Sequence, residues 1–322
     1  MSQDTRSQVL RFADAQTGDR HPLGPLAPLP PVLTNGNRAL LCFDLPPLAP
    51  GMMVLPSCAS LATEPYRFRF SLADVPLAPV PSAAEELPAG NPAAAGSGAP
   101  VEQHLDYFHI REALPAAQLL LEVEPAAALS SCCLITLSLR PQLTPAPNAP
   151  EPLVTPAPPT LSQRLADPAI AMRICSPTAT TMALLQQGYT VDWKTFTAAC
   201  RDPATGMYGV WPLNVYQASR HQALGAVESF SDWTPVTRLL AAGIPVVASI
   251  RYANGALPGA PQAQSGGHLV LVYGVDADNV LVNDPAGERP DAVRRRYPRR
   301  AFERAWFAER GAGYYFLPAP RD

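Results

Sequence analysis

The chain has 322 residues and a formal net charge of −3; 16% of its residues are charged and 39 are prolines. A chain of this length accommodates two domains of ordinary size. Its slightly acidic charge argues against a nucleic-acid partner, which requires a clustered positive surface. One basic run, at residues 294–300, is flanked by acidic residues, so we expect an ion-paired, solvated face there.

Targeting and cofactor signals are few. The polar N-terminus has no apolar segment typical of a signal peptide, and no window approaches the about 18 continuous apolar residues of a membrane span. We therefore expect a cytoplasmic protein by default, with leaderless export left open. The six cysteines show no metal-ligand spacing, and we expect reduced thiols. We expect no metal and no cofactor, because phosphate-binding glycine loops and dinucleotide fingerprints are also lacking.

Residues 1–140 contain short apolar segments separated by turns. In one of them, Tyr66, Phe68, Phe70 and Leu72 alternate with polar residues, a period of two that is typical of a half-buried strand. Several such segments predict an antiparallel β-sandwich-like accessory domain, with strands near 39–43, 52–55, 66–72, 119–123 and 134–139. The stretch 82–100, rich in Ala, Gly, Pro and Ser, is predicted to be a disordered excursion.

The composition changes beyond this region. Residues 141–159 carry eight prolines and little apolar periodicity, which predicts an interdomain linker. Residues 160–322 form the second predicted domain, with helices near 177–187, 192–200, 213–221 and 232–242. Predicted strands follow near 246–250, 268–275 and 280–283. Helices followed by an antiparallel sheet indicate an α+β fold.

Cys175 lies at the expected start of the first of these helices. Pro177 suits a first helical turn, and Gly188 is a plausible C-terminal stop. A thiol at a helix N-terminus lies near unpaired N–H groups and the positive end of the dipole, which favours the reactive thiolate. Alternatively, Cys175 is simply a small buried apolar residue.

His268 opens an apolar strand and is the best candidate for a base. If the following turn spans 275–279, residue 274 pairs with 280 and residue 270 with 284, which places Asp284 near His268. A register shift of one residue would present Asn283 instead. Either side chain could accept the imidazole N–H and fix its tautomer, the role of a third triad member. Taken alone, His268 could equally be a structural histidine and Asp284 a turn residue.

A family resemblance links these residues. Over about residues 160–310 the chain resembles papain-like cysteine peptidases of the bacteriocin-leader-peptidase-like group. The resemblance rests on the motifs Ser162-Gln163, Cys175-Ser176-Pro177-Thr178, Gly267-His268-Leu269 and Asn283-Asp284-Pro285. It implies a papain-like fold with Cys175 as nucleophile, His268 as base, Asp284 as orienting residue and Gln163 as oxyanion-hole side chain. The N-terminal half resembles, more weakly, β-sandwich domains that precede such peptidase domains in some bacterial proteins.

Two departures from the family pattern concern the site. Gln163 lies 12 residues before Cys175, so either the insert 165–172 loops out or Gln163 is an ordinary surface residue. Ser176 stands where many of these peptidases have glycine, which would crowd the site.

Two functions of different class follow. The first is a cysteine peptidase that acts on a peptide or protein substrate through a thioester; acyl transfer would use the same groups. The second is a catalytically silent papain-like scaffold with a binding or structural role, which the proline-rich segments and low charge also fit. Convergence of Cys175, His268 and Asp284 in one place favours the first. The oligomeric state is not indicated.

Overall fold

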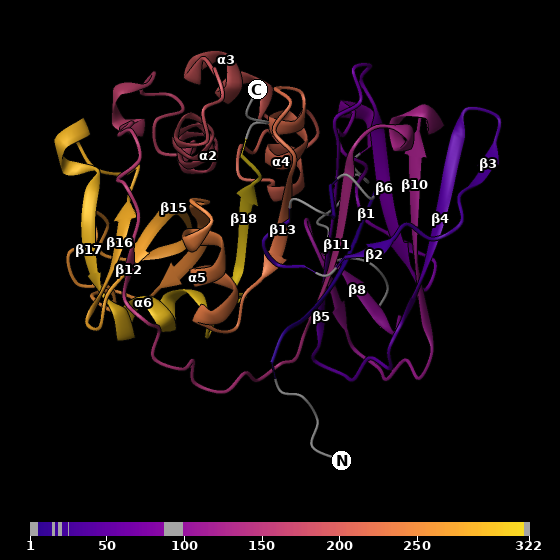
Figure 1. Ribbon diagram of the computed structural model, residues 1–322, viewed down its shortest axis with the longest axis horizontal. Coiled ribbons are helices and arrows are strands. Elements are labelled where there is room, and N and C mark those ends of the chain that lie inside the picture. The colour runs from indigo at the N-terminus through magenta and orange to yellow at the C-terminus, as the bar shows by residue number, and fades with distance from the viewer. Residues whose placement is uncertain (1–5, 15–16, 19–20, 25, 87–98, 319–322) are drawn as a thin grey trace.

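The computed structural model describes residues 6–14, 17–18, 21–24, 26–86 and 99–318. Two halves of the chain lie side by side, and the segment after residue 140 runs beneath them (Figure 1). The N-terminal half consists mainly of strands, and the C-terminal half combines helices with a sheet. The predicted α+β class is therefore confirmed. Among the described residues, no helix has the length and apolar character needed to cross a membrane.

The N-terminal half contains two sheets, and each predicted strand is present. The first sheet has the order β2 (Ala27–Pro28), β1 (Gln8–Ala13), β11 (Cys133–Arg140), β5 (Met53–Ser60), β9 (Phe108–Ile110), β8 (Val101–Gln103). The second has the order β3 (Leu33–Asn35), β4 (Arg38–Leu45), β10 (Ala117–Glu124), β6 (Arg67–Leu72), β7 (Val75–Pro76). Apart from the β1–β2 pair, which is parallel, the pairs are antiparallel.

Burial separates the strands of these sheets into two kinds. Strands β4, β6 and β10 alternate between buried and more exposed side chains, and for β6 this is the alternation predicted from the sequence. By contrast, every residue of β5 and β11 is buried. Side chains from one face of these strands join the hydrophobic cluster shared with the second sheet, and side chains such as Leu55 and Leu134 join the cluster of the C-terminal half. Burial on both faces explains why even the polar residues Thr136 and Ser138 of β11 are buried: they face β13 (Gly225–Ser229) of the C-terminal half.

The C-terminal half is built on an antiparallel sheet of order β13 (Gly225–Ser229), β18 (Ala312–Phe316), β14 (Val246–Tyr252), β15 (Ser265–Val275), β16 (Asn279–Asn283), β17 (Arg294–Pro298). Helix α2 (Cys175–Gln186) packs on β14, β15 and β18. The other helices are α3 (Trp193–Ala199), α4 (Trp211–Ser219), α5 (Trp233–Ala241) and α6 (Arg299–Trp306). In Figure 1, α2, α3 and α4 lie above the sheet and α5 and α6 below it.

All four predicted helices are present, and side-chain caps mark the start of two of them, α3 and α5. The carboxylate of Asp192 accepts the backbone N–H of Thr195 at the start of α3, and Asp232 accepts that of Thr234 at the start of α5. Gly188, at φ +87°, follows the end of α2. The strands β13, β17 and β18 and the helix α6 were not predicted.

The basic run is only partly the solvated face expected from the sequence. Arg296 pairs with Asp276, and Arg300 pairs with Glu303, both as exposed guanidinium groups. However, residues 294–298 form β17, and Arg299 is buried in an ion pair with Glu303. The expectation of full solvation was wrong at that position, because α6 packs Arg299 against the 276–279 turn, where it donates to a backbone carbonyl.

Two predicted loops differ in outcome. Within the predicted linker 141–159, β12 (Leu153–Val154) pairs with the end of β15, so this part of the linker is an added strand of the C-terminal sheet. In the predicted excursion 82–100, residues 84–86 form a short 3-10 helix, and residues 87–98 lie outside the described residues. The predicted domain boundaries stay a prediction.

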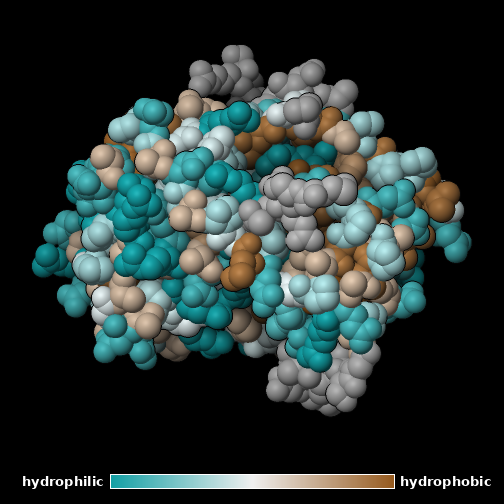
Figure 2. Space-filling view, turned by 90° about the horizontal axis from the view of Figure 1, so that it is seen from below, coloured by the Kyte–Doolittle hydropathy of each residue, from teal (hydrophilic) through white to brown (hydrophobic). Residues whose placement is uncertain are grey.

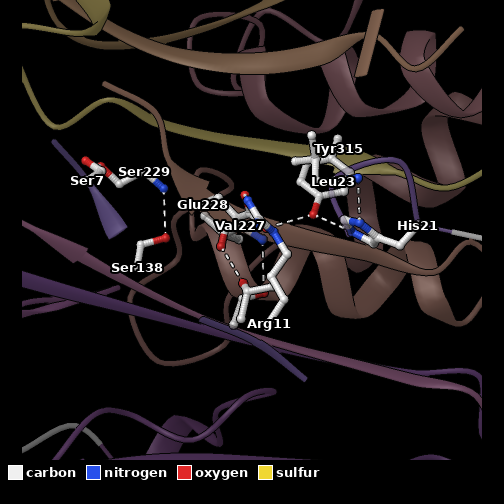
Figure 3. Close-up of polar contacts among 11 residues, drawn as sticks. Ser7, Arg11, His21, Leu23, Ser138, Val227, Glu228, Ser229 and Tyr315 are labelled. Atoms are coloured by element: carbon white, nitrogen blue, oxygen red, sulfur yellow. Dashed lines mark hydrogen bonds and ion pairs between the residues drawn. The ribbon is translucent and has the colours of Figure 1, made fainter. Parts of the chain in front are cut away.

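The two halves meet across β13, which lies against β5 and β11. Hydroxyl groups of the N-terminal sheet bind the backbone of β13: Thr136 donates to the Val227 carbonyl at 2.9 Å, and Ser138 accepts the Ser229 N–H at 2.9 Å. Nearby, the Arg11 guanidinium donates two hydrogen bonds of 2.7 Å to Glu228 (Figure 3). Thus the outer edge of β13 is covered by side chains of the other half.

The face seen from below differs in character between its two sides. Figure 2 shows hydrophilic residues over most of the left part of this face, which belongs to the C-terminal half, and more hydrophobic residues on the right. Among the described residues, the exposed large hydrophobic side chains are scattered; they are Val32, Leu33, Leu143, Val154, Leu165, Met172 and Met207.

Candidate active site

Cys175 is the first residue of α2, as the sequence indicated for a thiol at a helix N-terminus. Its side chain is partly buried, and the backbone N–H of Leu269 on β15 hydrogen-bonds to it. The N–H groups of the first helical turn have no partner within the helix. The thiol therefore lies between the open end of a helix and the strand that carries His268.

His268 lies on β15 with its imidazole buried between Cys175 and Asp284. Its Nε2 atom is 2.7 Å from Asp284 Oδ1, and its side chain also hydrogen-bonds to Cys175. Because Nε2 faces the carboxylate, Nδ1 is the nitrogen left to face the thiol. The structure thus brings together three of the four residues singled out from the sequence.

The strand register that places Asp284 contains a bulge. Residue 274 pairs with 281 instead of 280, so the predicted register was wrong next to the turn. A β-bulge at Tyr273 corrects the offset, and Leu271 then pairs with Asn283 and Val272 with Val282. At the site itself the register is the predicted one.

Asp284 has no exposed surface and makes several hydrogen bonds. Its Oδ1 also accepts the backbone N–H of Ala286 at 2.8 Å, and its Oδ2 accepts the hydroxyl of Tyr297 at 2.6 Å. The alternative residue, Asn283, points elsewhere: its side-chain amide donates to the Pro159 carbonyl at 2.9 Å. Asn283 therefore holds the backbone of the segment at residue 159, and Asp284 is the residue that contacts His268.

The electrostatics of the three groups favour an ion pair. Burial opposes ionisation of Cys175, but the hydrogen bond and charge of His268 outweigh it and lower the pKa of the thiol. Burial likewise opposes the charged form of His268, but Asp284 and Cys175 raise its pKa to about 10. The pKa of Asp284 is lowered despite its burial, mainly by the charge of His268. These directions describe a thiolate beside an imidazolium held by a carboxylate.

Gln163 is buried, at 1% exposed, in a short 3-10 helix at residues 163–165. Its backbone N–H donates to the Pro285 carbonyl at 2.9 Å, which ties it to the residue after Asp284. Both polar atoms of its side-chain amide lack a hydrogen-bond partner among the described residues. The reading of Gln163 as an ordinary surface residue was therefore wrong, while Leu165 and Met172 of the insert are exposed.

Ser176 does not crowd the site. Its hydroxyl is buried and hydrogen-bonds to the hydroxyl of Tyr314 on β18, beneath α2. A side chain is tolerated here because it fills the space between the helix and the sheet instead of facing Cys175.

Tyr297 is the site residue that sequence reasoning missed. It lies in β17 within the run Arg294-Arg295-Arg296-Tyr297. The three arginines led to the prediction of a solvated face for this run. The sequence signal that could have identified Tyr297 is that it is the one aromatic residue among charged residues. It is also the one buried residue of β17.

Comparison with known proteins concerns the same part of the chain. Residues 158–314 match the model of the Peptidase_C39 like family. A solved structure described as a candidate C39-like peptidase from Bacillus anthracis is 16% identical, with a TM-score of 0.41; the similarity covers 53% of this chain and all of that one. A search of curated proteins finds no match. The predicted resemblance of the C-terminal half to cysteine peptidases is confirmed by the family match over residues 158–314.

Proposed function

We propose that the protein is an active cysteine peptidase with Cys175 as nucleophile, His268 as acid and base, and Asp284 as the residue that orients His268. The observation that carries this proposal is the hydrogen-bonded series Cys175, His268, Asp284 and Tyr297. A buried histidine between a thiol and a fully bonded carboxylate satisfies the geometric requirement for an activated nucleophile.

The reaction follows from this arrangement. The Cys175 thiolate attacks the carbonyl carbon of a peptide bond, and the His268 imidazolium donates its proton to the leaving amine as the C–N bond breaks. The resulting thioester is attacked by water, whose proton passes to the now neutral His268. Cleavage of the C–S bond releases the acid and restores the thiolate–imidazolium pair.

Gln163 is proposed to stabilise the oxyanion together with the backbone N–H of Cys175. An unpartnered buried amide is costly in a folded protein unless it has another role. Its backbone link to Pro285 keeps it next to the segment that holds Asp284. A tetrahedral oxyanion would give its N–H the missing partner only during the reaction, which is the differential binding that speeds catalysis.

We further propose the division into an accessory domain at residues 1–140, a linker at 141–159 and a peptidase domain at 160–322. The accessory domain is proposed to be a β-sandwich, because side chains from both N-terminal sheets share one hydrophobic cluster.

The first test is the pH dependence of alkylation of Cys175 by a small haloacetamide, mapped by mass spectrometry. We expect an apparent pKa below the about 8.5 of a free thiol, so labelling slows only when the pH falls through that lowered value. In His268→Ala the lowering group is gone and burial remains, so the apparent pKa should rise above that of a free thiol. Cys42, whose pKa is raised by burial, is an internal control in the same samples.

The second test is cleavage of a peptide library. We expect cleavage by the wild type, none by Cys175→Ala, and a loss of about 10²–10³ in kcat for Gln163→Ala with an unchanged alkylation profile. If Cys175 labels as an ordinary thiol in both proteins and no peptide is cleaved, the proposal fails and the silent scaffold is the better account.

A further inference from the structure

The hairpin of β8 and β9 brings a carboxylate and two imidazoles together. Glu102 and His109 are direct cross-strand partners, so their side chains lie on the same face. His104 lies two residues after Glu102 and therefore shares that face. All three side chains are partly exposed, and one ligand atom from each lies within 4.8 Å of the others.

The distances in this group fit ligands of one ion better than they fit hydrogen bonds. Glu102 Oε2 is 3.5 Å from His109 Nδ1 and 3.8 Å from His104 Nε2. Both separations exceed the about 2.7–3.2 Å of an N–H···O hydrogen bond. Two ligands of a tetrahedral zinc ion with bonds of about 2.0–2.1 Å lie about 3.3 Å apart. A small closure of the side chains would therefore complete the coordination geometry.

Arg111 also contacts the carboxylate of this group. Arg111 donates to Glu102 Oε2 from Nη2 at 2.9 Å and from Nε at 3.1 Å. A carboxylate offers about four lone-pair sites on two oxygens, so Arg111 and a metal ion can share it. Ionised carboxylate and neutral imidazole are the forms that bind metal ions.

We propose that Glu102, His104 and His109 bind a zinc ion, with water in the remaining position. The sequence spacing gave no sign of it, because the ligands are separated by the turn of a hairpin and match no helical or paired-cysteine pattern. This proposal departs from the expectation of no metal site that the sequence gave rise to. This inference is independent of the proposed peptidase activity.

The position of the hairpin indicates what the ion would do. The ring of His104 stacks on Tyr107 with centroids 4.4 Å apart, and Arg310 of the C-terminal half lies over Tyr107 at 5.9 Å. The neighbouring Asp106 is buried and accepts the backbone N–H of Trp211, the first residue of α4. An ion bound to His104 would therefore fix the hairpin turn where it contacts the other half.

The test is zinc titration of the full chain carrying Cys175→Ala, because the Cys175–His268 pair could itself bind zinc. After chelator treatment, zinc is added in competition with a chromophoric indicator. We expect one zinc ion per chain and an increase in thermal stability on binding. His104→Ala and His109→Ala should each weaken binding by at least tenfold. The matched control is His221→Ala, a partly exposed histidine on the C-terminal side of α4, which should bind zinc as the parent does.

Cobalt(II) supplies a second readout that does not depend on stability. The parent should give the visible absorption of four-coordinate cobalt with nitrogen and oxygen ligands and no thiolate charge-transfer band, and the two histidine variants should lose it. Circular dichroism of each metal-free variant verifies that it is folded. The proposal is overturned if the parent binds no zinc, if both variants bind it as the parent does, or if the cobalt spectrum has a thiolate band.

Discussion

The hydroxyl of Tyr297 reaches a carboxylate that has no contact with solvent. Asp284 receives hydrogen bonds from His268, Ala286 and Tyr297, so each oxygen has at least one donor. A buried carboxylate that loses a donor carries the desolvation penalty of that group, about 1–3 kcal/mol. The strength with which Asp284 holds His268, and hence the state of Cys175, should depend on this tyrosine.

Tyr297→Phe tests that dependence. Loss of the hydroxyl should raise the pKa of Asp284, weaken its hold on the imidazolium and raise the apparent pKa of Cys175 in the alkylation assay. Turnover should fall by about tenfold, the equivalent of about 1.4 kcal/mol. The control is Tyr252→Phe, whose hydroxyl binds the Gln262 carbonyl at 3.3 Å and not Asp284. Equal profiles for both variants would contradict a positioning role for Tyr297.

Single site residues could be predicted from the sequence where the signal lies in their immediate neighbours along the chain. Cys175 could be found from its place before a helix, and His268 from its place at the start of an apolar strand. The choice between Asp284 and Asn283 could not be made, because it depends on a bulge that no residue pattern announced. Tyr297 was hidden since its contact is made across two neighbouring strands.

Among the elements, the turn between α6 and β18 is the most constrained. Gly311 has φ +61°, and a Cβ there would lie 2.0 Å from the Phe230 carbonyl oxygen and 2.7 Å from the Arg140 guanidinium. Gly243, after α5, has φ +76° but no atom within 4 Å of such a Cβ. The two glycines share a backbone conformation and differ in crowding.

Alanine substitutions should separate these two effects. Both variants should lose about 1–2 kcal/mol of unfolding free energy from the left-handed conformation. Gly311→Ala should lose a further amount of about 1–3 kcal/mol from overpacking. Denaturant unfolding at one temperature measures the difference, and equal losses would show that the backbone near Phe230 moves aside freely.

Two of the strands that were not predicted, β13 and β18, escaped prediction for the same reason. Period-two alternation identifies a strand with one face in solvent, as in β6, whereas all five residues of β13 and β18 are buried. Their burial depends on the N-terminal sheet and on helices far away in the chain. Helices α2 to α5, by contrast, were predictable because their starts and stops are encoded in neighbouring residues.

Over the whole molecule, a buried ion pair joins the two halves. Arg11 and Glu228 form a bidentate pair (Figure 3). Glu228 also accepts a hydrogen bond from the hydroxyl of Tyr315, and this hydroxyl oxygen lies 2.8 Å from Nε2 of His21. The Glu228 side chain is 1% exposed. Removing one partner of such a pair leaves an uncompensated buried charge, which costs about 3–5 kcal/mol.

Glu228→Gln should therefore destabilise both halves together. The four tryptophans lie in the C-terminal half, so their fluorescence reports on its unfolding, while protection of the buried Cys58 thiol reports on the N-terminal half. We expect both signals to change in one transition, at a lower denaturant concentration than in the wild type. Glu124→Gln, in an exposed pair with Arg38, should change stability by less than about 1 kcal/mol. Two separate transitions in the wild type would contradict coupling of the halves.

The strand order of the C-terminal sheet has a consequence for how the chain folds. Strand β18 inserts between β13 and β14, so neither of these earlier strands can pair with the other. The β13 side of the sheet therefore cannot form from hairpins of consecutive strands. The chain between residues 229 and 312 must first form a closed loop that brings β18 beside β13. Because such long-range closure is slow, we expect docking of β18 to be the late step that joins β13, and the N-terminal sheet packed against it, to the rest of the C-terminal sheet.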